Sequence, residues 1–108
     1  MEFMVANRRE QLEEFVRQRP GDALVRYGLA MELMRGGESE AALEQFRLLH
    51  EQHPDYAAGF QQAGQLLIAL DRREEARAVL ERGLAAAGRS GDRHAAGEMQ
   101  GLLDEIGG

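Results

Sequence analysis

The chain has 108 residues, of which 44% are hydrophobic and 30% charged, and its net charge at neutral pH is −6. This length predicts one domain, 1–108. The acidic balance argues against a general nucleic-acid or anionic-membrane surface, because such a surface needs a basic patch to neutralise phosphates. The chain contains no Cys, which excludes disulfides, thiolate metal ligands and a Cys nucleophile.

All 13 cationic residues are Arg, which we attribute to the codon usage of a GC-rich genome, and we expect a bacterial source. The apolar run in residues 1–7 is too short for a signal peptide. No stretch approaches the roughly 20 apolar residues of a membrane span. We therefore expect a soluble, cytoplasmic protein with no membrane partner.

Helix-forming residues dominate the composition, and strand-like alternation is hard to find, so the sequence predicts an all-α fold. Turn signals divide the chain into six segments of helical length, at about 2–19, 22–35, 38–53, 56–70, 72–87 and 92–106. Most of these segments carry an amphipathic stripe that needs a neighbouring helix to cover it. In chain order, the stripes include Leu12, Phe15 and Val16; Leu29 and Leu33; Leu43, Phe46 and Leu49; Phe60, Leu67 and Leu70; Val79, Leu80 and Leu84; and Met99, Leu103 and Ile106.

Polar residues and glycines at the breaks predict where the helices begin and end. Asp71 and Glu74 have the spacing of a capping box, and glycines at 36–37 and 88 can supply a left-handed residue that ends a helix. Four aspartates are placed to cap the N-terminus of a following helix: Asp22, Asp55, Asp71 and Asp92.

The chain contains an internal repeat. Its only two prolines, Pro20 and Pro54, lie 34 residues apart, and the next such step reaches Gly88. Two helices and two turns in 34 residues have the length of a tetratricopeptide repeat. Aligning residues 23–56 with 57–90 gives four identical pairs: Ala23/Ala57, Leu33/Leu67, Glu40/Glu74 and Ala42/Ala76.

In residue class the two copies resemble the tetratricopeptide repeat family. The first copy fits the family pattern at Leu29, Ala30, Leu33, Gly37, Ala42, Phe46 and Pro54. The second copy fits it at Phe60, Ala63, Gly64, Leu67, Asp71, Ala76, Leu80 and Gly83. The departures are Arg26 at an early bulky position, Leu49 at a small position and Gly88 in place of Pro. The resemblance implies a right-handed stack of antiparallel helix pairs.

The same period assigns roles to the two ends. Segment 1–19 corresponds to the second helix of a preceding repeat, and segment 92–106 corresponds to the first helix of a following one. Such terminal helices are either caps with a polar outer face or contacts between two molecules.

In this family the first helix of each pair lines a concave groove. The resemblance therefore implies a groove over 24–35, 58–69 and 95–102, which would bind a peptide or a partner protein. Its lining would be Leu24, Tyr27, Met31, Met34, Arg35, Ala58, Gln61, Gln65, Ile68, Ala69, Ala95, Met99 and Leu102. The chaperone-type carboxylate clamp of Lys and Asn is not supported, because these places hold Tyr27, Met31, Gln61 and Gln65.

The methionines of this set have two interpretations. Met is pliable and suits an adaptable binding surface, but Met31, Met34 and Met99 can equally be core filling. The sequence thus predicts a non-enzymatic protein–protein interaction module. The alternative is a self-association element that forms a homodimer through its end helices or its Met-bearing face.

We find no catalytic or metal-binding set and expect no cofactor. His50 and His53 share a helical spacing, but they lack a third ligand, and surface histidines near a helix C-terminus are common. The acidic pairs lie on what reads as solvated helix faces. The only two serines, Ser39 and Ser90, lie in turns, and the chain has no glycine-rich phosphate loop.

Overall fold

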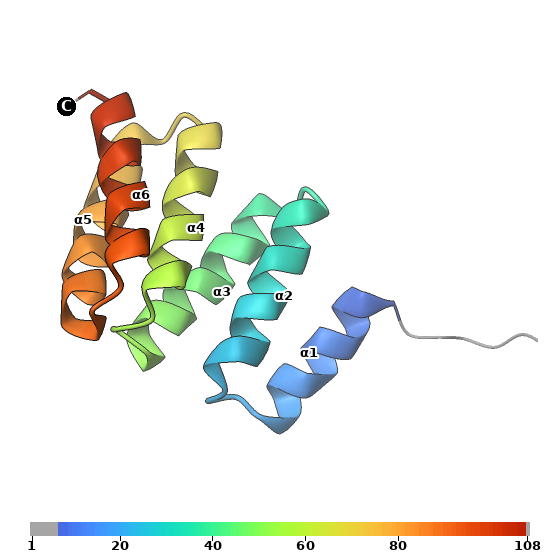
Figure 1. Ribbon diagram of the computed structural model, residues 1–108. Coiled ribbons are helices and arrows are strands. Elements are labelled where there is room, and N and C mark those ends of the chain that lie inside the picture. Colours follow the sequence, from blue (N-terminus) through green and yellow to red (C-terminus); the bar gives the residue numbers. More distant parts are fainter. Residues whose placement is uncertain (1–6, 108) are drawn as a thin grey trace, which may run out of the picture.

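The computed structural model describes residues 7–107, and within them the chain forms six α-helices and no strand (Figure 1). The helices are α1 (Arg8–Gln18), α2 (Ala23–Arg35), α3 (Ser39–Gln52), α4 (Ala57–Ala69), α5 (Arg73–Ser90) and α6 (Arg93–Glu105). The all-α prediction and the number of helices are confirmed.

Consecutive helices pack as antiparallel neighbours and form two layers. The helices α2, α4 and α6 lie in one layer, which we call the inner layer, and α4 contacts both α2 and α6. The helices α1, α3 and α5 lie in the second, outer layer, and each packs against its sequence neighbours (Figure 1). The stack is elongated, with extents of 57 × 28 × 20 Å.

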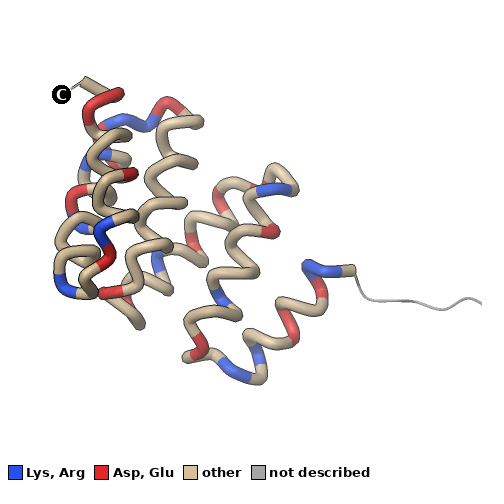
Figure 2. Tube along the Cα trace, viewed as in Figure 1, with Lys and Arg blue, Asp and Glu red and all other residues tan. Residues whose placement is uncertain are grey.

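Helix α4 is shared by two hydrophobic cores. One core joins α1, α2 and α3 to α4 through Ala63 and Leu66. The other joins α5 and α6 to α4 through Ala57, Phe60 and Leu67. Because α4 is buried on both sides, it carries no charged residue in a chain that is 30% charged (Figure 2).

Two interior glycines allow the helices to approach closely. A Cβ at Gly64 would lie 2.4 Å from a methyl group of Leu80, and a Cβ at Gly83 would lie 2.4 Å from the sulfur of Met99. Both neighbouring side chains are fully buried, so neither has room to move aside. Both glycines are therefore sites of tight helix contact.

The N-terminal caps agree with the sequence in part. Asp22 accepts a hydrogen bond from Val25 N at 3.1 Å, and Asp92 accepts one from Ala95 N at 3.0 Å. The prediction is wrong for Asp55 and Asp71, because α4 and α5 begin one residue later, after Tyr56 and Arg72, with no side-chain cap.

The predicted capping box at Asp71 is replaced by a left-handed turn. Asp71 has φ 59° and is the one non-glycine residue with positive φ among the described residues. Gly37, its counterpart 34 residues earlier, has φ 79°. Both repeats therefore use the same turn, and Asp is tolerated in this region better than most side chains are.

The predicted end of the fifth helix is also wrong. Helix α5 continues through Gly88 to Ser90 and ends at Gly91, whose φ of 72° supplies the left-handed residue. Nothing within 4 Å surrounds a Cβ at Gly88, so this glycine only weakens the helix locally.

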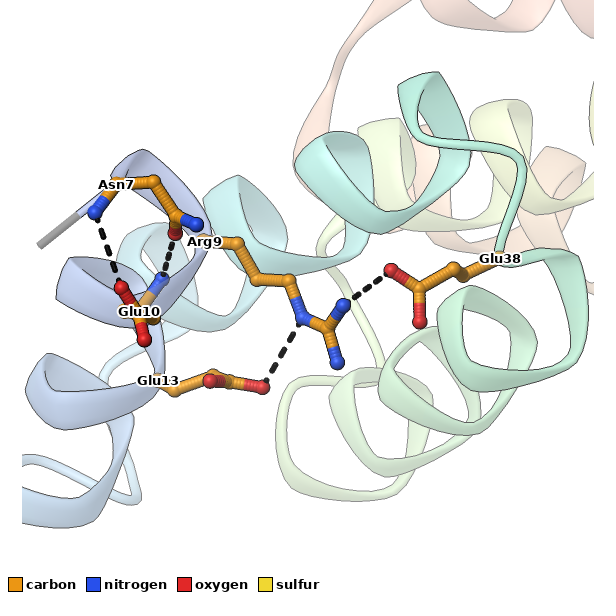
Figure 3. Close-up of polar contacts among 5 residues, drawn as sticks. All are labelled: Asn7, Arg9, Glu10, Glu13 and Glu38. Carbon is orange, nitrogen blue, oxygen red and sulfur yellow. Dashed lines mark hydrogen bonds and ion pairs between the residues drawn. The ribbon is translucent and has the colours of Figure 1, made fainter.

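Helix α1 begins later than the predicted start at residue 2. Asn7 caps it and forms a capping box with Glu10, in which Asn7 Oδ1 accepts from Glu10 N at 2.8 Å and Asn7 N donates to Glu10 at 3.2 Å (Figure 3). Residues 2–6 of the predicted segment lie outside the described residues. Arg9 then ties α1 to the start of α3 through an ion pair with Glu38 (Figure 3).

Arg26, the departure from the repeat pattern, is buried and occupies the place of the expected bulky residue. Its guanidinium donates to Gln45 Oε1 at 2.6 Å and to the carbonyl of Pro20 at 2.9 Å. The aliphatic stem fills the core while the head group holds the first proline turn. Arg26 is therefore compatible with the repeat.

The proline turns are also held by later helices. The ring Nε2 of His53 hydrogen-bonds the carbonyl of Gly21 at 2.8 Å. One turn further, Arg89 donates to Asp55 at 2.5 Å and to the carbonyl of Pro54 at 3.0 Å. Each turn between repeats is thus fastened to the end of the following outer-layer helix.

Candidate partner-binding surface

The inner-layer helices bring part of the predicted groove together on one face. From α2, the surface receives the exposed Leu24 and Arg35 and the half-buried Tyr27, Met31 and Met34. Leu24 is 70% exposed, the largest exposure among the exposed large hydrophobic residues of the described chain. The three half-buried side chains pack their inner sides on the first core and leave their outer sides to solvent.

Tyr27 organises the centre of this surface. Its ring lies 6.5 Å from the buried ring of Phe46 and 5.6 Å from the ring of Tyr56. Burial raises the pKa of both tyrosines, so both phenols stay protonated at neutral pH. Neither hydroxyl has a hydrogen-bond partner among the residues described, so both are available to a ligand.

Helix α4 contributes uncharged polar groups. Gln61 is half-buried and Gln65 exposed, and neither side chain is hydrogen-bonded within the described part of the chain. At the α2 end of the surface, Glu32 pairs with Arg8 at 3.6 Å and with Arg35 at 3.4 Å. The surface is therefore apolar and hydrogen-bonding at its centre and charged only at its edge.

The prediction for Met99 is wrong. Met99 is 0% exposed and packs against Gly83 and Phe60 in the second core, where it cannot contact a ligand. Helical phase predicts a groove position for Met99, but phase alone does not tell which side of α6 packs against α5. Ala95, another predicted groove residue of α6, is also buried, whereas Ile68 and Leu102 are half-buried against that core.

Sequence reasoning missed Tyr56. It lies in the turn before α4, and its ring reaches Tyr27 of the preceding repeat. A groove defined by the first helix of each pair omits such turn residues. The available signal was an aromatic residue directly after the proline turn, between Asp55 and an otherwise small segment.

The two histidines considered as metal ligands point to different places. His50 is buried, at 6% exposure, and its ring stacks on Phe60 at 3.9 Å, so the expectation of a surface histidine is wrong there. His53 is engaged with Gly21. No cluster of three or more potential metal ligands occurs among residues 7–107.

None of the described helices is long and apolar enough to span a membrane.

The layered helix pairs and the exposed strip on the inner layer define a class of protein, the helical-repeat scaffolds that bind other proteins. No family model matches the chain. A tetratricopeptide repeat-containing protein of Pseudomonas aeruginosa is 34% identical over 97 residues, which cover 90% of this chain and 92% of that protein. The chain therefore belongs to the tetratricopeptide repeat family.

Solved structures agree with this assignment. A tetratricopeptide repeat domain protein of Salinibacter ruber is 30% identical with a TM-score of 0.75, covering 81% of this chain and 88% of its own. A Bordetella parapertussis protein is 30% identical with a TM-score of 0.78, covering 95% and 89%. A yeast Sti1 domain in complex with an Hsp70 peptide has a TM-score of 0.84 at 16% identity, covering 91% and 78%, and shows a shared fold.

Proposed function

We propose that this chain is a non-enzymatic interaction module that binds a peptide or a partner protein on one face of α2 and α4. This face, the α2/α4 surface, consists of Leu24, Tyr27, Met31, Met34, Arg35, Gln61 and Gln65. The observation that carries the proposal is the Tyr27–Tyr56 pair, whose two hydroxyls are unpaired among the described residues, together with the exposed Leu24 about one helical turn before Tyr27. Large amphipathic aromatics flanked by apolar area are the usual anchors of binding surfaces. The partner would bury apolar side chains against Met31 and Met34.

Binding would also use the free amides of α4. Gln61 and Gln65 would fix the register of the bound segment by hydrogen bonds, and Arg35 would contact it at the edge. Because α4 carries no charge, a bound segment with charges at its centre would lose their hydration without compensation. We therefore expect the central residues of the partner to be uncharged.

The test is a pull-down from source-cell lysate, with the captured protein purified and its affinity measured by calorimetry. Replacing Tyr27 or Met31 by Ala should weaken binding at least tenfold, since a buried anchor contributes about 2 kcal/mol or more. A Tyr27/Gln61/Gln65 triple alanine variant should abolish it. Each variant should retain the mass of the parent in sedimentation.

The matched control is Gln52→Ala, an exposed change on α3 in the outer layer. It should leave the affinity unchanged. A purified partner that binds the triple variant as tightly as the parent would refute the α2/α4 surface as its site.

Self-association through α1 is the second candidate function. Among the described helices α1 packs only against α2, and its Phe15 is 47% exposed. The exposed positions of α6 are mainly polar, including Arg93, Glu98 and Asp104, which suits a cap. An α1–α1 contact between two copies is therefore favoured over pairing of α1 with α6.

Sedimentation across a concentration series tests this candidate. A dimer should form in the parent, and Phe15→Asp should abolish it, because the carboxylate would be buried without a partner. Glu98→Arg on α6 serves as the control for the opposite end. A parent chain that is monomeric at millimolar concentration would eliminate self-association.

A further inference from the structure

A cleft of about 290 Å³ opens between the outer-layer helices α3 and α5. The backbones of α3 and α5 do not touch each other, but both helices pack against α4, which contributes Ala63 and Leu67 to the cleft. The apolar lining of the cleft is Leu43, Phe46, Ala63, Leu67 and Val79. Charged side chains from α3 and α5 stand around this lining.

One end of the cleft is closed by an ion pair. Arg72, just before α5, donates to Glu40 of α3 at 2.7 Å and to Glu75 at 2.7 Å. On the α3 side, Arg47 holds Glu44 at 2.6 Å. Both cations and the three glutamates of the cleft are therefore already engaged.

At the other end of the cleft, two side chains have unused hydrogen-bonding groups. Arg82, about two turns beyond Glu75, has no carboxylate partner in the described chain, and its guanidinium lies over the ring of Phe60, 5.2 Å from the centroid. His50 stacks on the same ring and also lines the cleft. The Nε2 atom of His50 is buried and has no hydrogen-bond partner within residues 7–107.

These two residues are an arginine with free donors and a buried imidazole with an unused nitrogen. The backbone carbonyl of Gly59 accepts a hydrogen bond from the His50 ring, so Nε2 is the unprotonated acceptor nitrogen of the neutral ring. Burial chiefly, and then the charge of Arg82, lower the pKa of His50 to about 4, and hence the ring is neutral at pH 7. A ligand that satisfies both groups offers a negatively charged oxygen to Arg82 and an N–H donor to His50.

The remaining charges limit the ligand further. The chain has a net charge of −6, and three glutamates line the same cleft, so a polyanion would be repelled. A single carboxylate beside Arg82 avoids this repulsion. From Arg72 to Arg82 a helix rises about 15 Å, the length of four or five extended residues.

We propose that the α3/α5 cleft is a second docking site, which takes a short apolar segment of a partner protein bearing one carboxylate next to Arg82 and His50. The apolar side chains rest on Leu43, Leu67 and Val79. The carboxylate accepts hydrogen bonds from the guanidinium of Arg82, and a backbone N–H of the bound segment donates to His50 Nε2. This site is independent of the α2/α4 surface, so one can exist without the other.

The probe is the peptide acetyl-Leu-Leu-Asp-amide, titrated into the full chain and followed by NMR, with acetyl-Leu-Leu-Asn-amide as its uncharged match. The Asp peptide should shift the resonances of His50 and Arg82 and bind roughly tenfold tighter than the Asn peptide, because hydrogen bonds to a charged group are the stronger ones. Its carboxylate should also raise the pKa of His50 in the complex.

Two variants separate the contribution of Arg82 from that of His50. Arg82→Gln should weaken the Asp peptide at least tenfold, and His50→Phe, which keeps the stacked ring but removes Nε2, should weaken it several-fold. Arg93→Gln on α6 is the matched control and should have no effect, as should Tyr27→Ala in the α2/α4 surface. If His50→Phe fails to fold, Arg82→Gln alone decides.

The proposal is overturned if the two peptides bind equally, if the shifts map to α2 and α4, or if neither peptide shifts His50 and Arg82 at millimolar concentration. Loss of binding in Tyr27→Ala would overturn it too. None of these outcomes bears on whether the α2/α4 surface holds its own partner.

Discussion

At the scale of single residues, the roles of several buried side chains differ from those that the sequence predicts. His50 was read as a surface residue from its place near a helix end, yet it lies under Phe60 in the core. Arg26 was a departure from the repeat pattern, yet it fills the position of the bulky residue and satisfies a turn. Residue type alone did not reveal either role, because both depend on the neighbouring helix.

The buried His50 predicts a pH-dependent stability. Its pKa in the folded chain is about 4, below the unfolded value of about 6.5. The unfolded chain therefore binds a proton that the folded chain does not between these two values, so the free energy of unfolding falls as pH drops from 6.5 to 4. The loss amounts to roughly 3 kcal/mol at most, because one pKa unit corresponds to about 1.4 kcal/mol.

Urea denaturation at pH 7 and at pH 4.5 measures this effect. In His50→Gln the difference in unfolding free energy between the two pH values should shrink by about 2 kcal/mol. Exposed glutamates whose pKa is lowered by Arg partners, such as Glu44 and Glu75, also lose stabilisation in acid. The comparison of the variant with the parent removes their share, and an unchanged pH difference would contradict the role of His50.

At the scale of elements, the helix stripes and the 34-residue step were sufficient to predict six helices in the right order. The errors lie at their ends. Asp71 has the sequence of an N-cap, but the turn needs a left-handed residue at that position, and the helix begins after Arg72. Local spacing predicts that a helix starts near a residue, while the path of the chain between two packed helices decides which residue serves as the cap.

The difference in packing around Gly64 and Gly101 predicts opposite effects for their replacement by Ala. Gly64→Ala should lower the free energy of unfolding by about 1–3 kcal/mol, because the new methyl group overlaps the buried Leu80. Gly101→Ala on α6 should raise it by about 0.5–1 kcal/mol, because nothing lies within 4 Å and Ala is the better helix former.

Thermal and urea unfolding of both variants checks this pair. Circular dichroism at low temperature should show that each keeps the helical content of the parent. A Gly64→Ala chain as stable as the parent would mean that Leu80 moves aside, and that the two helices are not held at this distance by the glycine.

At the scale of the whole molecule, stability should fall from the centre of the stack toward its first helix. Helix α4 belongs to both cores, whereas α1 packs against α2 and is otherwise tied to α3 by the exposed Arg9–Glu38 pair. In a helical stack each element is stabilised mainly by its neighbours, so an end helix with one neighbour opens most readily.

Hydrogen exchange followed by mass spectrometry tests this gradient. Amides of α1 should exchange at least tenfold faster than those of α4. Arg9→Ala should accelerate exchange in α1 only slightly, because exposed ion pairs contribute little. Equal protection in α1 and α4 would show that the stack opens as a single unit, or that another molecule covers α1.

The sequence by itself determined the fold class and the repeat, because amphipathic spacing, prolines and small residues act within one or two turns of helix. Tertiary structure alone decided how neighbouring helices meet. It moved Met99 into the core, brought Tyr56 beside Tyr27, and left His50 and Arg82 together in a cleft. These outcomes depend on how three helices meet, and a pattern read along one helix carries no information about its neighbours' positions.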